Sequence, residues 1–166
     1  MTSGTVIWIT GLPSAGKSTF AALAVETLRE RGVAAAVLDG DAVRASLVPA
    51  PGYDEAGRQS FYESLARLAA LLASQGLVVL VPATANRRAF RERARELAPR
   101  YLEVLVDTPL AECAARDTKG LYARSQSGEA THVPGAGAAY ERPVAPDVVA
   151  GNGSDRSALA ALLDRL

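Results

Sequence analysis

Short apolar runs recur along this chain, separated by longer segments in which apolar residues return every three or four positions. The short runs stop at glycine, proline or aspartate, which is typical of buried strands. We therefore expect strands over residues 6–9, 33–38, 77–81, 101–106 and 146–150.

The segments between these runs have the spacing of amphipathic helices. We expect helices over residues 20–31, 54–74 and 87–97, another that starts at Pro109, and a last one that starts near Ser154 or Asp155. Strands that alternate with helices predict an α/β protein with a parallel sheet covered on both faces. Ligands of such sheets bind at the carboxyl ends of the strands.

Two segments depart from this simple alternation. Five arginines lie between residues 87 and 95, but Glu92 and Glu96 interrupt them, so a solvated amphipathic helix is favoured over a nucleic-acid-binding stripe. Periodicity disappears between residues 117 and 142, where glycine, serine and alanine dominate. A loop of this length in a compact domain is typically a functional lid or a disordered segment.

Composition narrows the class of protein. A chain of 166 residues suits one domain spanning residues 1–166, and a net charge of zero argues against a nucleic-acid or acidic-membrane partner. The single cysteine, Cys113, excludes an intrachain disulfide, and we expect it to be an apolar filler on a helix. The N-terminus lacks a signal-peptide pattern, and no run is apolar enough to span a membrane, so we expect a cytoplasmic protein.

The most informative motif follows the first expected strand. Residues 11–18 read Gly-Leu-Pro-Ser-Ala-Gly-Lys-Ser, the pattern of a phosphate-binding loop (P-loop). The backbone N–H groups of such a loop curl round a phosphate, Lys17 reaches the β- and γ-phosphates, and the Ser18 hydroxyl binds Mg²⁺. A glycine-rich turn without this function is the alternative, but the strand before it and the helix after it favour a nucleoside triphosphate site.

Further polar residues are expected at the same edge of the sheet. Asp39 and Asp41 follow the second strand, Thr84 follows the third and Asp107 the fourth. An acid after the second strand can accept a proton from an acceptor hydroxyl or support Mg²⁺, although Asp39 or Asp41 could instead cap a helix that begins at Ala42. Arg44 could bind a phosphate or sulfate of the acceptor, and basic residues at the entrance of the 117–142 segment fit a closing lid.

Taken together, these motifs resemble the adenylyl-sulfate kinase (APS kinase) family. The matching segments are Gly11-Leu-Pro-Ser-Ala-Gly-Lys-Ser-Thr19, Leu38-Asp-Gly-Asp-Ala-Val-Arg44, Val106-Asp-Thr-Pro-Leu110, Arg116-Asp-Thr-Lys-Gly-Leu-Tyr122 and Ala139-Tyr-Glu-Arg-Pro143. The resemblance implies a three-layer P-loop fold with a parallel five-stranded sheet, helices on both faces and a lid. It also implies ATP and Mg²⁺ as cofactors and transfer of phosphate to the 3′-hydroxyl of adenylyl sulfate, with a homodimer as one possible assembly.

The resemblance also implies roles for individual residues. The ATP-binding set is Gly11, Ser14, Ala15, Gly16, Lys17, Ser18, Thr19, Arg116 and Asn152. The acceptor-binding set is Asp41, Arg44, Tyr53, Arg58, Lys119, Gly120 and Leu121. Catalysis is expected from Lys17, Asp39 and Thr84, and metal binding from Ser18 and Asp39.

Departures from the family pattern cluster on the acceptor side. Ser60-Phe-Tyr-Glu-Ser64 stands where the family has an Asn-containing run, and Thr131-His-Val-Pro-Gly135 lacks the lysine and aromatic residue of the family's lid. Adenylyl sulfate is the expected acceptor, with another nucleotide or a secondary-metabolite alcohol as the alternative. The remaining hypotheses for the function are an inactive nucleotide-binding regulator and a sulfotransferase.

Overall fold

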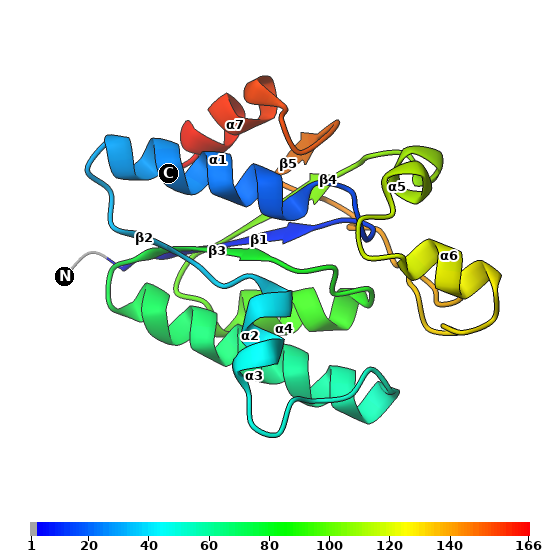
Figure 1. Cartoon of the computed structure of the whole chain (residues 1–166). Coiled ribbons are helices and arrows are strands. Elements are labelled where there is room, and N and C mark those ends of the chain that lie inside the picture. The colour runs from blue at the N-terminus through cyan, green and yellow to red at the C-terminus, as the bar shows by residue number, and fades with distance from the viewer. Residues whose placement is uncertain (1–2) are drawn as a thin grey trace.

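A computed structural model describes residues 3–166 and contains one parallel five-stranded sheet of order β2-β3-β1-β4-β5 (Figure 1). The strand that leads into the P-loop is therefore the central one. The strands are β1 (Thr5–Thr10), β2 (Ala35–Val37), β3 (Val78–Pro82), β4 (Tyr101–Val106) and β5 (Val148–Ala150).

Helices cover both faces of this sheet, which confirms the predicted α/β fold (Figure 1). One face carries α1 and α7, the other carries α3 and α4, and α5 and α6 lie beyond the carboxyl ends of the strands. The helices are α1 (Lys17–Glu30), α2 (Gly40–Ser46), α3 (Glu55–Ser74), α4 (Arg88–Leu97), α5 (Leu110–Arg116), α6 (Leu121–Gln126) and α7 (Arg156–Leu163).

The central strand shows why the sheet is buried on both sides. All six residues of β1 are buried, and successive side chains point to opposite faces. Ile7 and Ile9 therefore join one apolar core with α1 and α7, whereas Val6 and Trp8 join the other with α3 and α4. Cys113 is fully buried in the first core, which confirms its expected role as an apolar filler.

Element boundaries differ from the predictions mainly at the sheet edges. The second and fifth strands are shorter than expected, because only residues 35–37 and 148–150 pair with a neighbour. The short helix α2 begins at Gly40 rather than at Ala42, because Asp39 caps it. The last helix is capped by Asp155, whose side chain accepts from the Ala158 N–H, as one of the two predicted starts requires.

The arginine-rich helix α4 is not simply a solvated face. Arg91 is only 2% exposed and forms an ion pair with Glu103 of β4, with 2.8 Å between Nε and Oε1. The prediction of a solvated helix is correct for Arg93, which pairs with Glu63 and Glu96, but wrong for Arg91. The spacing places position 91 beside the buried Phe90 and Ala94, so its charge has to be compensated inside the protein.

The predicted 117–142 segment is ordered by specific contacts rather than structureless. It contains α6, and the buried Tyr122 of this helix donates its hydroxyl to the Pro13 carbonyl at 2.8 Å. Val133, also in this segment, is 4% exposed and packs in the core beneath the P-loop. Across residues 3–166, no helix is both long and apolar enough to cross a bilayer.

Candidate functional site

The P-loop joins β1 to α1 at the carboxyl edge of the sheet. Gly16 precedes α1 with φ +102°, a left-handed conformation that glycine adopts without strain, and Ser14 also has a positive φ. Ala15 is fully buried, and its carbonyl accepts a hydrogen bond from the Thr108 hydroxyl at 2.7 Å. The loop is thereby anchored to the segment after β4, while the exposed Ser18 and Thr19 lie in the first turn of α1.

Lys17 folds back onto the loop that it follows. Its Nζ donates to the carbonyls of Gly11 at 3.1 Å and Leu12 at 2.8 Å. Burial, and secondarily the charge of Lys119, lowers the pKa of Lys17 to about 8, against the opposing influence of Asp41, Asp39 and Cys113. Phosphate oxygens bound in the loop would offer this ammonium group negatively charged acceptors.

Ser18 and Asp39 meet beside the P-loop. The Ser18 hydroxyl donates to Asp39 Oδ2 at 2.6 Å, while Asp39 Oδ1 accepts from the N–H groups of Asp41 and Ala42. Asp39 therefore caps α2, which confirms the capping interpretation, and it contacts Ser18 of the P-loop, while its catalytic or metal-binding role stays a prediction. A hydroxyl and a carboxylate fit Mg²⁺, which is usually held by one or two protein oxygens together with phosphates and water. Residues 3–166 contain no cluster of three or more His, Cys, Asp or Glu side chains that could hold a metal without a nucleotide.

The lid crosses the P-loop at its first residues. Lys119 forms an ion pair with Asp41, and the hydroxyls of Ser14 and Thr118 lie 3.3 Å apart. Asp117 accepts from the N–H groups of Tyr122 and Ala123 and so orders the start of α6. Of the predicted acceptor residues on the lid, Lys119 is thus brought to Asp41, and Gly120 and Leu121 follow it at the start of α6.

Two further predicted ATP-binding residues are Arg116, which approaches Gly16, and Asn152, which adjoins the Gly16 neighbour Gly153. A Cβ on Gly16 would lie 2.8 Å from the Cα of Gly153 and 3.9 Å from Arg116 Nη1. Asn152 lies immediately before Gly153, and its Oδ1 accepts from the Ser154 N–H at 2.8 Å. The loop between β5 and α7 therefore packs against the start of α1, where sequence resemblance places the donor nucleotide.

The predicted acceptor residues gather near α2 and the start of α3. Arg44 is 8% exposed, and its guanidinium lies between the rings of Tyr53 and Phe61, with centroid distances of 4.3 and 4.0 Å. Its Nη1 donates to the carbonyls of Pro51 and Gly52, so part of the guanidinium that was predicted to bind the acceptor is engaged by the protein itself. Arg58 donates to the carbonyl of His132 and thereby links α3 to the lid.

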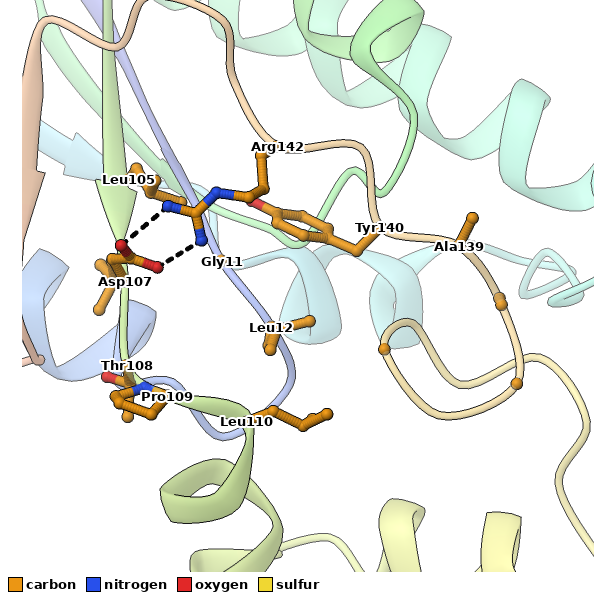
Figure 2. Close-up of a pocket in the computed structure, with 14 residues that line it drawn as sticks. Gly11, Leu12, Leu105, Asp107, Thr108, Pro109, Leu110, Ala139, Tyr140 and Arg142 are labelled. Atoms are coloured by element: carbon orange, nitrogen blue, oxygen red, sulfur yellow. Dashed lines mark hydrogen bonds and ion pairs between the residues drawn. The ribbon is translucent and has the colours of Figure 1, made fainter.

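Thr84 and Asp107 lie at the carboxyl ends of β3 and β4, as the parallel-sheet prediction requires. The carbonyl of Thr84 accepts from Thr10 Oγ1 at 2.6 Å. Asp107 forms a two-point ion pair with Arg142, at 2.6 and 2.8 Å, and this arginine lowers the pKa of the Asp107 carboxyl (Figure 2).

Asp107 and Arg142 line a cavity of about 430 Å³ between the P-loop and the end of the lid. Figure 2 shows Leu12, Leu110 and Tyr140 around this space. Arg142 was not among the predicted site residues, because its partner lies 35 positions away and no local pattern connects the two. Arg142 and Tyr140 both belong to the 139–143 motif, however, and that motif was a usable signal.

Comparison with known proteins gives a consistent result. A sequence model of the family described as adenylylsulphate kinase matches residues 3–151. The adenylyl-sulfate kinases of Citrobacter koseri and of Enterobacter sp. strain 638 are each 42% identical to this chain over 147 residues, covering 87% of it and 73% of the relative. A solved structure of the APS kinase CysC of Mycobacterium tuberculosis, in complex with AMPPNP and APS, has a TM-score of 0.91 and 38% identity, covering 99% of this chain and 98% of that one.

Proposed function

Since this chain belongs to the adenylyl-sulfate kinase family, we propose the following roles for its residues in that family's reaction. The chain is an ATP-dependent kinase that phosphorylates adenylyl sulfate on its 3′-hydroxyl and forms 3′-phosphoadenylyl sulfate and ADP. The observation that carries the residue roles is the cradle of Lys17, Ser18 and Asp39 under a lid whose Lys119 reaches Asp41.

On the donor side, the P-loop N–H groups and Lys17 hold the β- and γ-phosphates of ATP. The contacts of Lys17 with the Gly11 and Leu12 carbonyls are exchanged for contacts with phosphate oxygens. Arg116, near Gly16, and Asn152, next to Gly153, are proposed to lie against the nucleoside part; the approach of Arg116 and Gly153 to Gly16 supports this. Ser18 and Asp39 would hold Mg²⁺, which would neutralise part of the phosphate charge.

On the acceptor side, Arg44, Tyr53 and Arg58 position adenylyl sulfate, and Lys119, Gly120 and Leu121 close over it. The 3′-oxygen forms a bond to the γ-phosphorus while the bond from that phosphorus to the β–γ bridging oxygen breaks. Asp39 accepts the hydroxyl proton. Thr84, at the end of β3, lies on this side and is proposed to contact the reacting groups.

The whole chain is proposed to work as one kinase domain with residues 117–142 as its lid. A single sheet carries every described strand, and the lid packs Val133 and Tyr122 into the core next to the P-loop. A cytoplasmic location agrees with the single buried cysteine, which needs no oxidising compartment. A homodimer is the proposed assembly, to be tested by analytical ultracentrifugation.

Acceptor-dependent release of ADP tests this function. With MgATP fixed, adenylyl sulfate should stimulate ADP release and yield the 3′-phosphorylated product, and Lys17→Ala should lower kcat at least 100-fold, about 2.7 kcal/mol of transition-state stabilisation. Release of ADP only with another nucleotide or alcohol would instead identify a changed acceptor. No acceptor-dependent release with any of them would indicate a regulator, and transfer of a sulfuryl group without ATP would indicate a sulfotransferase.

A further inference from the structure

The backbone after β3 is held in a strained conformation. Ala85 is a buried non-glycine residue with φ +42°, in the left-handed region that such residues rarely adopt. Its N–H donates to the Tyr62 hydroxyl at 2.9 Å, and its carbonyl accepts from Arg91 Nη1. Strain of this kind persists only where the surroundings impose it, and it is concentrated at functional sites. Side chains from α3 and α4 therefore set how the segment 84–86 faces the acceptor.

The end of the lid is joined to this same segment. We call residues 139–142 the lid root. The side-chain amide of Asn86 donates to the Ala139 carbonyl at 3.1 Å, and the backbone carbonyl of Asn86 accepts from the Glu141 N–H at 2.8 Å. The Tyr140 and Thr10 hydroxyls lie 2.9 Å apart, and Thr10 in turn donates to the Thr84 carbonyl. The 84–86 segment and the lid root therefore form one hydrogen-bonded unit.

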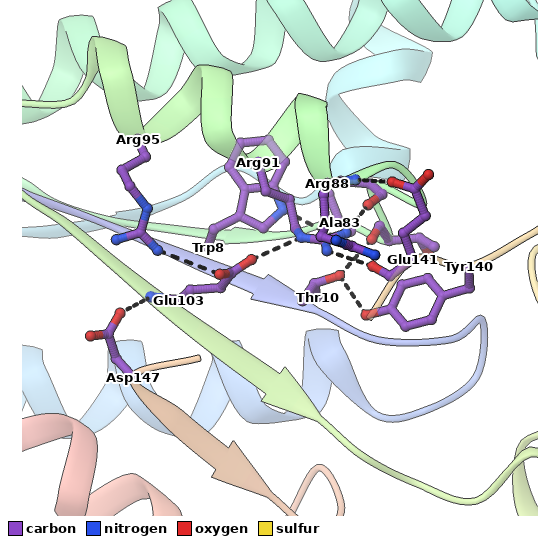
Figure 3. Close-up of polar contacts among 12 residues, drawn as sticks. Trp8, Thr10, Ala83, Arg88, Arg91, Arg95, Glu103, Tyr140, Glu141 and Asp147 are labelled. Atoms are coloured by element: carbon purple, nitrogen blue, oxygen red, sulfur yellow. Dashed lines mark hydrogen bonds and ion pairs between the residues drawn. The ribbon is translucent and has the colours of Figure 1, made fainter. Parts of the chain in front are cut away.

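A single buried guanidinium connects both parts of this unit. Arg91 Nε donates to Glu103, Nη1 to the Ala85 carbonyl, and Nη2 to the Glu141 carbonyl at 2.5 Å (Figure 3). Glu103 compensates the charge, which leaves the two terminal nitrogens for the backbone carbonyls. The planar fork of arginine can serve three acceptors in fixed directions, which lysine cannot.

We propose that Arg91 is a positioning residue for phosphoryl transfer, and that it acts by holding the 84–86 segment and the lid root in one fixed arrangement. The proposal rests on the kinase function given above. Arg91 touches neither substrate. It acts through Ala85 and Glu141, so its loss should impair use of the acceptor and leave ATP binding, on the far side of the P-loop, unchanged.

The test compares two variants, each of which removes an arginine that contacts the Glu103 carboxylate. Arg91→Met with Glu103→Leu removes the buried pair as a whole, so that no unpaired charge is left in the core. Arg95→Met is the matched control, because Arg95 also contacts Glu103, at 3.4 Å, and is nearly half exposed. In the double variant we expect the KM for adenylyl sulfate to rise at least tenfold and kcat to fall at least tenfold, with the Kd of an ATP analogue within threefold of wild type. The control should match wild type in all three.

Hydrogen exchange adds a readout that does not depend on activity. The amide protons of Ala85 and Glu141 should exchange at least tenfold faster in the double variant and at the wild-type rate in Arg95→Met. If the double variant does not fold, Arg91→Lys gives the same readouts, since it keeps the cation for Glu103 and loses the fork. Unchanged acceptor kinetics in a folded variant would overturn the role of Arg91 while the wild-type kinase activity stands. An inactive wild type would overturn the proposed function instead, and unchanged exchange at Ala85 and Glu141 would then overturn the role of Arg91 separately.

Discussion

Among single residues, Lys17 has the charge state that depends most on whether phosphates occupy the P-loop. In the free protein its ammonium group is held by two backbone carbonyls, and its pKa is lowered to about 8 from its ordinary value of 10.5. Burial is the main cause, and the nearby Lys119 adds to it. The cation is therefore poorly compensated until phosphates enter the loop.

This environment makes donor binding sensitive to pH. Below about 8 the free protein carries a charged Lys17, whereas above that pH the residue is neutral and must take up a proton before it can pair with phosphate. We expect the affinity for a non-hydrolysable ATP analogue to fall as the pH rises from 7 to 9.5. Calorimetry in buffers of different ionisation enthalpy should detect the proton uptake.

The matched control for this experiment is Lys17→Arg, because a guanidinium stays charged throughout this range. Its affinity should be lower than that of wild type but should not depend on pH. A wild-type affinity that is constant from pH 7 to 9.5 would contradict the lowered pKa of Lys17.

Functional residues could be predicted from the sequence where they belong to one short motif. Gly11, Gly16, Lys17 and Ser18 form one contiguous motif, and the structure brings Asp39 to Ser18 as expected. Arg91 could not be assigned in this way, because it joins Glu103, 12 positions away, to Glu141, 50 positions away. Such a role depends on tertiary contacts that no spacing within α4 reports.

At the scale of elements, two loops interlock through glycines. Gly153, between β5 and α7, lies so close to Gly16 that a Cβ on Gly153 would be 2.5 Å from the Gly16 carbonyl oxygen. That distance is far inside van der Waals contact, and the oxygen belongs to the backbone, which cannot turn aside as a flexible side chain would. The P-loop geometry therefore depends on a loop from the opposite end of the chain.

Substitution of Gly153 should disturb the donor site without touching a phosphate-binding group. We expect Gly153→Ala to weaken binding of an ATP analogue at least tenfold, about 1.4 kcal/mol, because Gly16 must move away from the new methyl group. Gly151→Ala is the control, since its Cβ would meet only Asp155 Oδ2 at an ordinary 3.7 Å. Equal affinities in the two folded variants would show that the loops adjust without cost.

Helices were predictable where they are long enough to show periodicity or where a residue such as Pro109 or Asp155 marks their start. The long helices α1, α3 and α4 each present enough turns for a periodic pattern, and their predicted ranges agree with the structure to within a few residues. The helices α2 and α6 have seven and six residues, too few to show periodicity. They form because Asp39 and Asp117 accept hydrogen bonds from their first N–H groups.

At the scale of the molecule, the sheet separates two apolar cores, and the site lies across its carboxyl edge. The alternation of strands and helices predicts the α/β class, but the order β2-β3-β1-β4-β5 depends on pairing between distant segments. The P-loop touches the β4–α5 connection, the β5–α7 connection and the lid. A ligand in the loop should therefore stabilise the molecule as a whole.

This coupling predicts a ligand-dependent rise in thermal stability. An ATP analogue with Mg²⁺ at 100 times its Kd should add about 2.7 kcal/mol to the free energy of unfolding. For a chain of this size that corresponds to a rise in Tm of roughly 5–10 °C. Differential scanning calorimetry should show this rise in wild type and little change in Lys17→Ala at the same analogue concentration. A wild-type Tm that does not move at saturation would contradict it.

The lid root determines how the lid could be exchanged between related enzymes. Residues 139–142 contact Asn86 and Asp107 so closely that they belong to the body of the protein rather than to its moving cover. A chimera that replaces residues 117–138 would keep the native junction. One that extends the graft to Arg142 would import foreign side chains against Asn86, Arg91 and Asp107, and would need those positions exchanged too. The transplantable module is thus four residues shorter than the segment that lacks periodicity.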